Sequence, residues 1–551
     1  MQTAESTTSQ SNSPIAAWSR GADRLYMSWA KSRAFRMIHR SWFAQFGLLA
    51  VVFGLMRLLM TSLAKYPEDI YLDSFIGNGL FAKPREAVIV LALSALLFAS
   101  SRRLHWRRLG GRWARVSAFV LLLLLFWGVA GVGFNYYTNQ AYLADRVLIL
   151  TLVLLSARWP AFSLPAVAYC MLFFGQVGLS AGDLETTDKL ALLYANYAVV
   201  SWVLLRTAFP MRARALPWFL LALMIAAYFA PGWAKLTVSG ELEPTAWLLH
   251  DPLHCLVATG HAHGWMSWWD RQQVGELVSF LAGFSPLMAA FTLLAELAAP
   301  FLGLSRRLAP LWLVLVIGMH AGIFAFTGIL FWKWVCVDML LIWGLLSLRP
   351  QRGRQRWLRV VAFAALIACF PLYAKPKFLG WLDSNVSETY FVEVVAEDGH
   401  TYRVQQKDFS PYDITFEQGA FHYANPGPVV NDVWGNAYSY ELGRRMNETT
   451  NAASMQSLIR KEGRVLYHEK KAATLDSFLQ QYFRNANARG DSMEWLEAVG
   501  PPHHVQTRSG GDRYDFQTRV KRVQLRFVRT FFDGEHIVTL DDHVVREVVV
   551  E

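Results

Sequence analysis

A lysine near the end of an apolar run is the side chain best placed for chemistry in this sequence. Lys235 is the second-last residue of the run 216–236, LPWFLLALMIAAYFAPGWAKL, which is long enough to cross a membrane. Pro231 removes a helix hydrogen bond and Gly232 loosens the backbone, so we expect a broken helix here. Broken helices at membrane depth line cavities, where a desolvated lysine favours its neutral form and can act as a base. Tyr228 is expected on the same face; in the alternative, Lys235 is an anchor that extends to the membrane surface.

Three further ionisable residues interrupt apolar runs: Arg57, Glu296 and His320. A charged group within a span costs about 2.5–3.5 kcal/mol on insertion scales, so each should face a partner or a cavity. The alternative for each is an interhelical hydrogen bond that only holds the bundle together. Counted along the predicted spans, His320 lies near mid-membrane, within reach of the lysine pocket, and Glu296 lies nearer the inner face. We therefore expect Lys235 and Glu296 not to touch.

Four histidines lie close together in the loop that follows this run: His250, His254, His261 and His263. Their H-x-x-x-H and H-x-H spacings could chelate a metal ion from a helix or a strand. The chain has no H-E-x-x-H motif, and tryptophans nearby in the loop favour a position at the lipid headgroups. We therefore predict interfacial histidines and no metal site.

The composition is that of a membrane protein. Hydrophobic residues make up 54% of the 551 residues and charged residues only 17%, and the mean hydropathy is +0.24. The net charge of +11 comes from arginines beside apolar runs, which argues against a nucleic-acid partner. The 4 cysteines form no C-x-x-C pair, so neither a disulfide framework nor a zinc ribbon is expected.

The apolar runs predict a multi-pass α-helical membrane bundle of about nine to eleven spans, because the second and fourth runs are short. Residues 1–41 are expected to form a cytoplasmic, partly disordered N-terminus, residues 42–375 the transmembrane domain, and residues 376–551 an α+β domain. The predicted spans are 43–64, 87–101, 116–134, 146–156, 162–180, 190–205, 216–236, 277–304, 310–330, 335–348 and 358–374.

The distribution of arginine predicts the orientation. Arginines precede the first span and follow each even-numbered span, which is typical of cytoplasmic loops. The N-terminus is therefore expected inside the plasma (inner) membrane and the C-terminal domain outside it. This places Lys235 at the outer end of its span.

The C-terminal 175 or so residues have the pattern of a soluble α+β domain. Two hairpins are predicted, 390–397 with 401–406 around Asp398-Gly399, and 523–532 with 536–540 around Asp533-Gly534. Helical patterns cover 433–446, 453–461, 475–487 and 492–499. The domain carries neither a Gly-rich phosphate loop nor a G-x-S-x-G motif.

Several of these segments resemble one membrane-protein family. Residues 228–236, YFAPGWAKL, look like the aromatic, small-Gly and Lys-Leu signature of the vitamin K-dependent γ-carboxylase-like superfamily, also called the HTTM (horizontally transferred transmembrane) domain. Residues 293–342 are similar to the family's next block, with an acidic residue, a basic loop and a histidine-bearing helix, and residues 53–60, FGLMRLLM, to its arginine-bearing first helix. The resemblance covers residues 43–348.

The resemblance implies a reaction and the residues that perform it. Lys235 would be the base that deprotonates a reduced, vitamin K-like quinone, and His320 would orient that reactant. Tyr228, Glu296 and Arg57 would line the quinone site. Oxygen would then convert the quinol to a strong base used on a substrate held by the outer domain.

The function expected on these grounds is that of a carboxylase-like or quinol-dependent membrane enzyme. Its partners would be membrane lipid, a lipid-soluble quinone and a peptide or protein substrate at the C-terminal domain. The alternative is a non-catalytic membrane scaffold or lipid-binding protein that anchors an outer interaction domain. A transporter is a third hypothesis, supported only by the predicted helix break.

The predicted orientation can be tested by labelling. A cysteine introduced at Asp398 should react with a membrane-impermeant thiol reagent in intact cells, because the arginine pattern places the C-terminal domain outside. The unmodified chain, with its 4 native cysteines, gives the background. Labelling that appears only after lysis would reverse the orientation.

Overall fold

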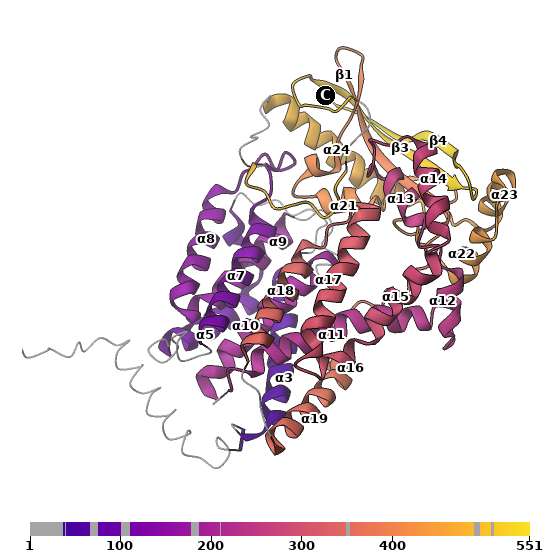
Figure 1. Cartoon of the computed structure of the whole chain (residues 1–551). Helices are drawn as coiled ribbons and strands as arrows, with labels where there is room; N and C mark the ends of the chain where they lie inside the picture. Colours follow the sequence, from indigo (N-terminus) through magenta and orange to yellow (C-terminus); the bar gives the residue numbers. More distant parts are fainter. Residues whose placement is uncertain are drawn as a thin grey trace, which may run out of the picture.

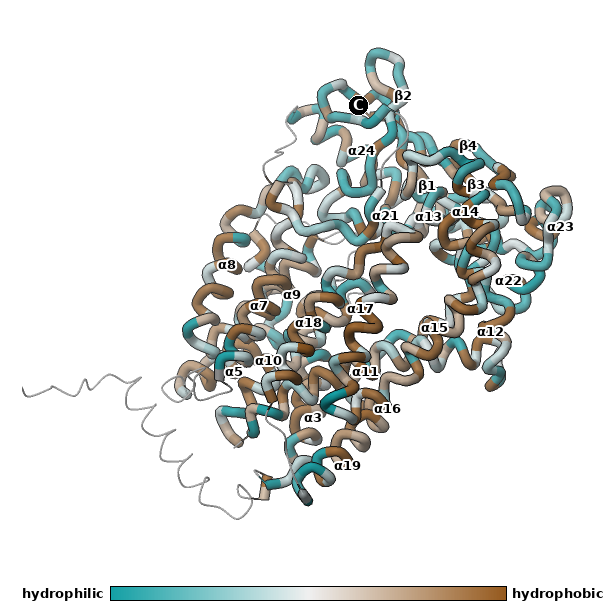
Figure 2. Tube along the Cα trace, in the orientation of Figure 1, coloured by the Kyte–Doolittle hydropathy of each residue, from teal (hydrophilic) through white to brown (hydrophobic). Residues whose placement is uncertain are grey.

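The computed structural model describes residues 37–38, 40–66, 75–100, 111–177, 187–209, 211–348, 353–489, 496, 498–507 and 512–550. It has two parts, a long helical bundle and a smaller part with a β-sheet that covers one end of the bundle (Figure 1). The bundle is mostly hydrophobic along its length, whereas the sheet-bearing end is mostly hydrophilic (Figure 2). Most of the predicted N-terminal region, residues 1–41, lies outside the described residues.

Ten helices form the described part of the bundle, packed around a single apolar core. Their side chains are apolar on nearly every face, which is typical of helices that are covered by lipid or by one another. They are α3 (Trp42–Leu63), α5 (Pro84–Ala99), α7 (Gly111–Ala130), α8 (Leu143–Arg158), α9 (Ser163–Gln176), α10 (Thr187–Ala208), α11 (Ala215–Leu236), α17 (Leu308–Thr327), α18 (Trp332–Ser347) and α19 (Arg354–Ala368). Two short helices, α4 (Gly79–Ala82) and α20 (Phe370–Tyr373), flank them.

Five of the described helices, α3, α7, α10, α11 and α17, are long and apolar enough to cross a membrane. A sixth span results if the bent pair α14 (Arg271–Ala282) and α15 (Ser285–Leu297) is counted as one. The other predicted spans fall on helices such as α5, α8 and α18, of 16 residues each, which reach only about 24 Å. A multi-pass helical architecture is therefore supported, but helix length does not support nine to eleven spans.

Two predictions about single helices are wrong. Helix α11 is not broken, because it continues through Pro231 to Leu236 and loses only the hydrogen bond that the proline cannot donate. The predicted span 277–304 is not straight, because α14 and α15 meet at 68°. As a result, α15 runs obliquely from α14 back to the bundle, where α15 and α16 (Ala299–Gly303) pack against α11 (Figure 1).

The C-terminal part contains a four-stranded antiparallel sheet in the order β2-β1-β3-β4. Strands β1 (Val386–Ala396) and β2 (Thr401–Arg403) form one predicted hairpin, and β3 (Val520–Phe532) and β4 (Ile537–Val549) form the other. Helices α23 (Ala452–Glu462) and α24 (Glu469–Arg489) match predicted helices, but α22 (Tyr440–Asn447) is shorter than the pattern at 433–446. The predicted helix 492–499 lies mostly outside the described residues.

The bundle and the C-terminal part share a core at their junction. The loop between α7 and α8 inserts Tyr136, whose ring stacks on Phe516 with centroids 5.3 Å apart and lies against Tyr482. The side chain of Asn485 on α24 donates hydrogen bonds to the carbonyls of Tyr136 and Tyr137 at 2.7 and 3.1 Å. The junction is thus packed like the interior of one domain, and it fixes how the C-terminal part sits on the bundle.

Candidate functional site

Lys235 forms an ion pair with Glu296. The ammonium lies 2.7 and 2.8 Å from the two carboxylate oxygens, and both side chains are buried. The expectation that these residues do not touch is therefore wrong. The bend before α15 is the reason, since it carries Glu296 to the end of α11 instead of toward the inner face.

Gly232 makes this contact possible. A Cβ atom at position 232 would lie 2.8 Å from the Cβ of Glu296, closer than packed carbon atoms approach. The absence of a side chain therefore lets α15 pack directly against α11. The role of this glycine is close helix packing rather than the helix break predicted from the sequence.

The ion pair works against a free amine at Lys235. A carboxylate held on the nitrogen stabilises the charged ammonium, and the ring of Trp247 in α12 (Pro244–His250) adds a cation–π contact at 5.2 Å. Lys235 is also two helical turns, about 10 Å, from Tyr228 along α11. The arrangement therefore favours a charged lysine that is fixed in place. This matches neither the predicted anchor at the membrane surface nor the predicted free base.

Tyr228 and His320 do meet, inside the bundle. The Tyr228 hydroxyl lies 2.9 Å from Nε2 of His320 on α17 and donates to Asp338 on α18 at 2.8 Å. All three residues are buried, and the rings of Trp312 and Trp334 pack against the tyrosine. This hydrogen-bonded triad ties α11, α17 and α18 together at a depth where polar groups need internal partners.

Arg57 lies apart from these residues. It sits on α3 and lines an apolar groove of about 500 Å³ between α3 and α19, together with Leu58 and Tyr373. The loop after α11, which bears the four histidines, contacts the C-terminal part. His263 is buried and stacks on Trp434 of the C-terminal part with ring centroids 3.9 Å apart. The interfacial prediction for this histidine is therefore wrong, because the loop folds as α13 (Cys255–Ala262) beneath the sheet.

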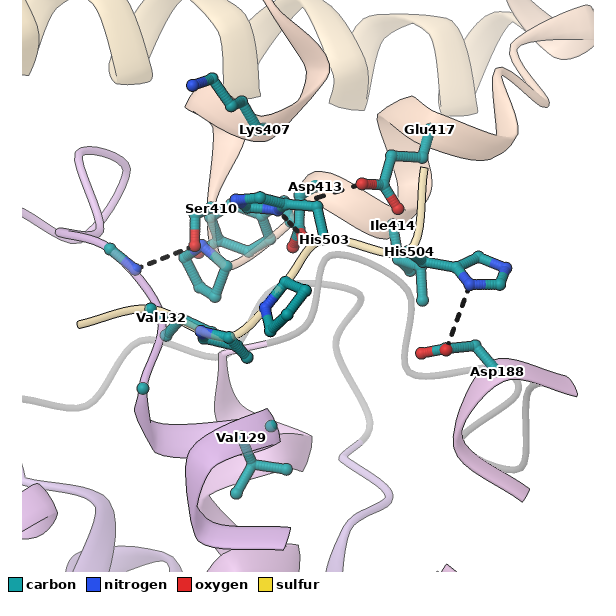
Figure 3. A pocket seen from close by; sticks show the side chains of 18 of the residues that line it. Val129, Val132, Asp188, Lys407, Ser410, Asp413, Ile414, Glu417, His503 and His504 are labelled. Atoms are coloured by element: carbon teal, nitrogen blue, oxygen red, sulfur yellow. Dashed lines mark hydrogen bonds and ion pairs between the residues drawn. The ribbon is translucent and has the colours of Figure 1, made fainter. Parts of the chain in front are cut away.

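A large cavity lies at the junction of the bundle and the C-terminal part; we call it the junction cavity. It has a volume of about 670 Å³, within the usual range of ligand sites. Figure 3 shows that ionisable side chains reach it from both parts. Those that line it are Asp188, Lys189, Lys333, Lys407, Asp413, Glu417, His503, His504 and Arg513.

A buried ion pair forms the bundle side of the junction cavity. Asp188, at the start of α10, pairs with Lys333 at the start of α18, and both side chains are less than a tenth exposed. Nδ1 of His504 lies 3.1 Å from the other oxygen of Asp188 (Figure 3). Lys189 is beside them, with its ammonium 3.6 Å from the centre of the Phe174 ring.

A second cluster faces it from the C-terminal part. Asp413 and Glu417 are four residues apart on α21 (Asp413–Gln418), so their carboxylates share one helix face. Nδ1 of His503 lies 2.9 Å from Asp413 and 3.9 Å from Glu417. Burial and the charge of Asp413 raise the pKa of Glu417 well above its usual value. Burial acts the same way on Asp413, but the hydrogen bond and charge of His503 outweigh it and lower the pKa of Asp413.

Backbone contacts hold the two histidines at the cavity. Pro501 and Pro502 lack N–H groups, so their segment stays extended and offers carbonyls to the bundle. Trp332 donates its indole N–H to the Pro502 carbonyl at 3.0 Å. The Leu330 amide donates to the carbonyl of His504 at 2.7 Å. His503 and His504 are therefore fixed to the start of α18.

Sequence reasoning missed both clusters. Asp188 and Lys333 are charged groups at the ends of apolar helices, the same signal that singled out Glu296. The Pro-Pro-His-His run at 501–504 was a second signal, because adjacent prolines favour a rigid, extended backbone that would hold the two following histidines in fixed positions. Their meeting depends on the C-terminal part folding back onto the bundle, which local patterns do not specify.

Comparison with known proteins adds no relative: the chain matches no family model, no curated protein and no solved structure.

A buried carboxyl pair lies near the end of α11 that bears Lys235. The backbone N–H of Asp383 donates to Asp251 at 3.1 Å, and both residues are about 5% exposed. Burial raises the pKa of Asp383 to about 7, although the charge of Lys235 opposes this shift. Burial and the charge of Asp383 raise the pKa of Asp251 well above its usual value. Both shifts favour a proton held on this pair in the folded protein.

This pair should make stability depend on pH. The folded state keeps a proton that an unfolded aspartate loses near pH 4, so the free energy of unfolding should fall as pH rises from about 4 through about 7. Asp383→Asn stays neutral and should reduce the slope of this fall by at most about 1.4 kcal/mol per pH unit, the contribution of one group. Denaturation of the purified protein between about pH 5 and about pH 8 measures it, with the exposed Glu535→Gln as control. Equal slopes for all three proteins would exclude a shared proton.

Proposed function

We propose that the chain is a multi-pass membrane enzyme whose reaction takes place in the junction cavity. The supporting observation is that two ionisable clusters, a buried one on the bundle side and a partly buried one on the other, face the same space of about 670 Å³. Burying charge is costly, and groups with shifted pKa values that converge in a cleft are candidates for chemistry. A non-catalytic scaffold would need only an apolar junction.

The geometry supports proton transfer by His503. Its Nδ1–H donates to Asp413 at 2.9 Å, which fixes the ring and stabilises the imidazolium that forms when Nε2 accepts a proton. Lys189 lies on the opposite side, where its positive charge would stabilise an anion that develops on the substrate. The substrate class that fits is a polar molecule that loses a proton and gains negative charge.

The position of the arginines supports the proposed orientation. Arg212 donates to the Arg40 carbonyl at 3.2 Å and Arg306 to the Leu345 carbonyl at 3.1 Å, so both lie at helix ends remote from the sheet. Figure 1 shows the starts of α3 and α19 at this same end of the bundle. Basic side chains gathered there favour a cytoplasmic face, with the junction cavity and the C-terminal domain outside the plasma membrane.

His503→Gln and Asp413→Asn should each fail to complement deletion of the gene. A positioned general base contributes about 10²–10⁴-fold to a rate, so its loss removes most activity. The exposed His536, which also neighbours two carboxylates, provides the matched control, and His536→Gln should complement fully. Membrane insertion is checked by fractionation. Full complementation by both cavity variants would leave the non-catalytic scaffold as the better account.

The family resemblance supports a second candidate, quinol-dependent carboxylase-like chemistry within the bundle. In its favour, two of the residues it assigns, Tyr228 and His320, form a buried hydrogen bond. Lys235 would act as base on a reduced quinone, and the C-terminal domain would hold a peptide or protein substrate. For this to happen, the Lys235–Glu296 ion pair would have to open, since a paired ammonium has no free lone pair.

Lys235→Arg separates the two candidates. Arginine keeps the positive charge and can pair with Glu296, but it cannot lose its proton in a protein. Quinol chemistry with Lys235 as base therefore predicts a protein that inserts normally and has no function in the complementation assay. Full function of the arginine variant would exclude the base and leave the junction cavity as the site.

A further inference from the structure

Two acidic side chains of α21, Asp413 and Glu417, lie close together, and the described residues around them offer a hydrogen bond of normal geometry to only one of them. Like charges four residues apart destabilise a helix, and α21 has only 6 residues to absorb the cost. Asp413 is satisfied, since His503 donates to it at 2.9 Å. Glu417 is not: its side chain is 1% exposed, and within the part of the chain that the structure describes neither of its oxygens makes a hydrogen bond of normal geometry. The Val505 amide is near enough to act on its charge, without reaching that geometry.

Neither of the nearby lysines is a direct ionic partner of Glu417. Lys333 is paired with Asp188, so its charge is matched on the other side of the junction cavity. This lysine and Lys189 both act on the charges of Asp413 and Glu417, but among the described residues no ion pair joins either lysine to either carboxylate. The Lys189 ammonium lies over the Phe174 ring. In the described ranges, the closest ionic contact of Glu417 is therefore Nδ1 of His503 at 3.9 Å. Its carboxyl group faces a polar cavity beside this histidine, where a cation could take the place of the proton that its raised pKa favours.

We propose that Asp413, Glu417 and His503 form a binding site for a divalent transition-metal ion such as Zn²⁺ or Mn²⁺. One imidazole nitrogen and two carboxylate oxygens are a ligand set that these ions accept. The three ligand atoms lie within 4.8 Å of one another, and among the described residues no other group of three His, Cys, Asp or Glu side chains meets this criterion.

The distances fit a metal centre after small movements. Bonds of about 2.0–2.2 Å in tetrahedral geometry place ligand atoms about 3.3 Å apart. The distances from Nδ1 of His503 are 2.9 Å to Asp413 and 3.9 Å to Glu417, on either side of that value. Binding would exchange the proton shared by His503 and Asp413 for the ion, so His503 would serve as ligand rather than base. With three protein ligands, a position stays open toward the junction cavity for water or a substrate oxygen.

The site shares the junction cavity with the proposed reaction but not the role of His503 as base, since the metal would occupy that side chain. It rests on the proposed function only for its purpose. Its test is metal binding, which needs no substrate. Full-length, tag-free protein in detergent is titrated with ZnCl₂ or MnCl₂ alone and followed by calorimetry, and bound metal is counted by mass spectrometry after dialysis. We expect about one ion per chain, with affinity that rises with pH because the ligands must lose protons.

The variants identify the ligands. Glu417→Gln, Asp413→Asn and His503→Gln should each weaken binding at least about tenfold, since each removes one of three ligands. Glu417→Gln keeps the shape of the side chain and removes a buried charge, so it should fold at least as well as the unmodified protein. His536 with Asp533 and Glu535 at 4.0 Å is a matched surface cluster, and His536→Gln should bind metal normally.

Each outcome decides the question. Absence of binding to the unmodified protein, or equal binding by the three variants, would overturn the site. If no metal binds and the His503 variant still fails to complement, the metal site is excluded and His503 remains the proposed base. If metal binds and the ligand variants complement the deletion, the metal site stands and the proposed reaction falls.

Discussion

The ion pair between Asp188 and Lys333 is the interaction on which the junction depends. Both side chains are almost fully buried where α10 and α18 begin, and His504 of the C-terminal part completes the cluster. A charge in such a place costs several kcal/mol unless it is paired, so loss of any member leaves the others exposed to that cost. The pair thus joins α10 to α18 within the bundle. Through Asp188 it also makes a polar contact with His504 of the C-terminal part.

The consequence is a cavity with a charged lining at the edge of an apolar bundle. Since Lys333 and Asp188 neutralise each other, the less compensated charge lies opposite, on α21. Asp413 obtains a proton donor from His503, whereas Glu417 obtains none of good geometry. This imbalance underlies both the proton transfer and the metal site that we propose.

The sequence predicted what local patterns can encode. Apolar runs identified the long helices, and Asp398-Gly399 and Asp533-Gly534 identified both hairpins, because glycine at positive φ is a local requirement of tight turns. Depth was harder. Glu296 was placed nearer the inner face on the assumption of a straight span, and the 68° bend brought it to Lys235. His503 and Lys333 are far apart in the chain, and only the fold-back of the C-terminal part brings them to one cavity.

A double-mutant cycle on Asp188 and Lys333 tests the central claim most directly. Asp188→Asn and Lys333→Met should each lower the free energy of unfolding by about 3–5 kcal/mol, because each leaves one buried charge unpaired. The double variant should lose clearly less than the sum, with a coupling energy of at least about 1 kcal/mol. Effects that simply add, or single variants as stable as the unmodified protein, would show that the two charges are not paired and would contradict the account.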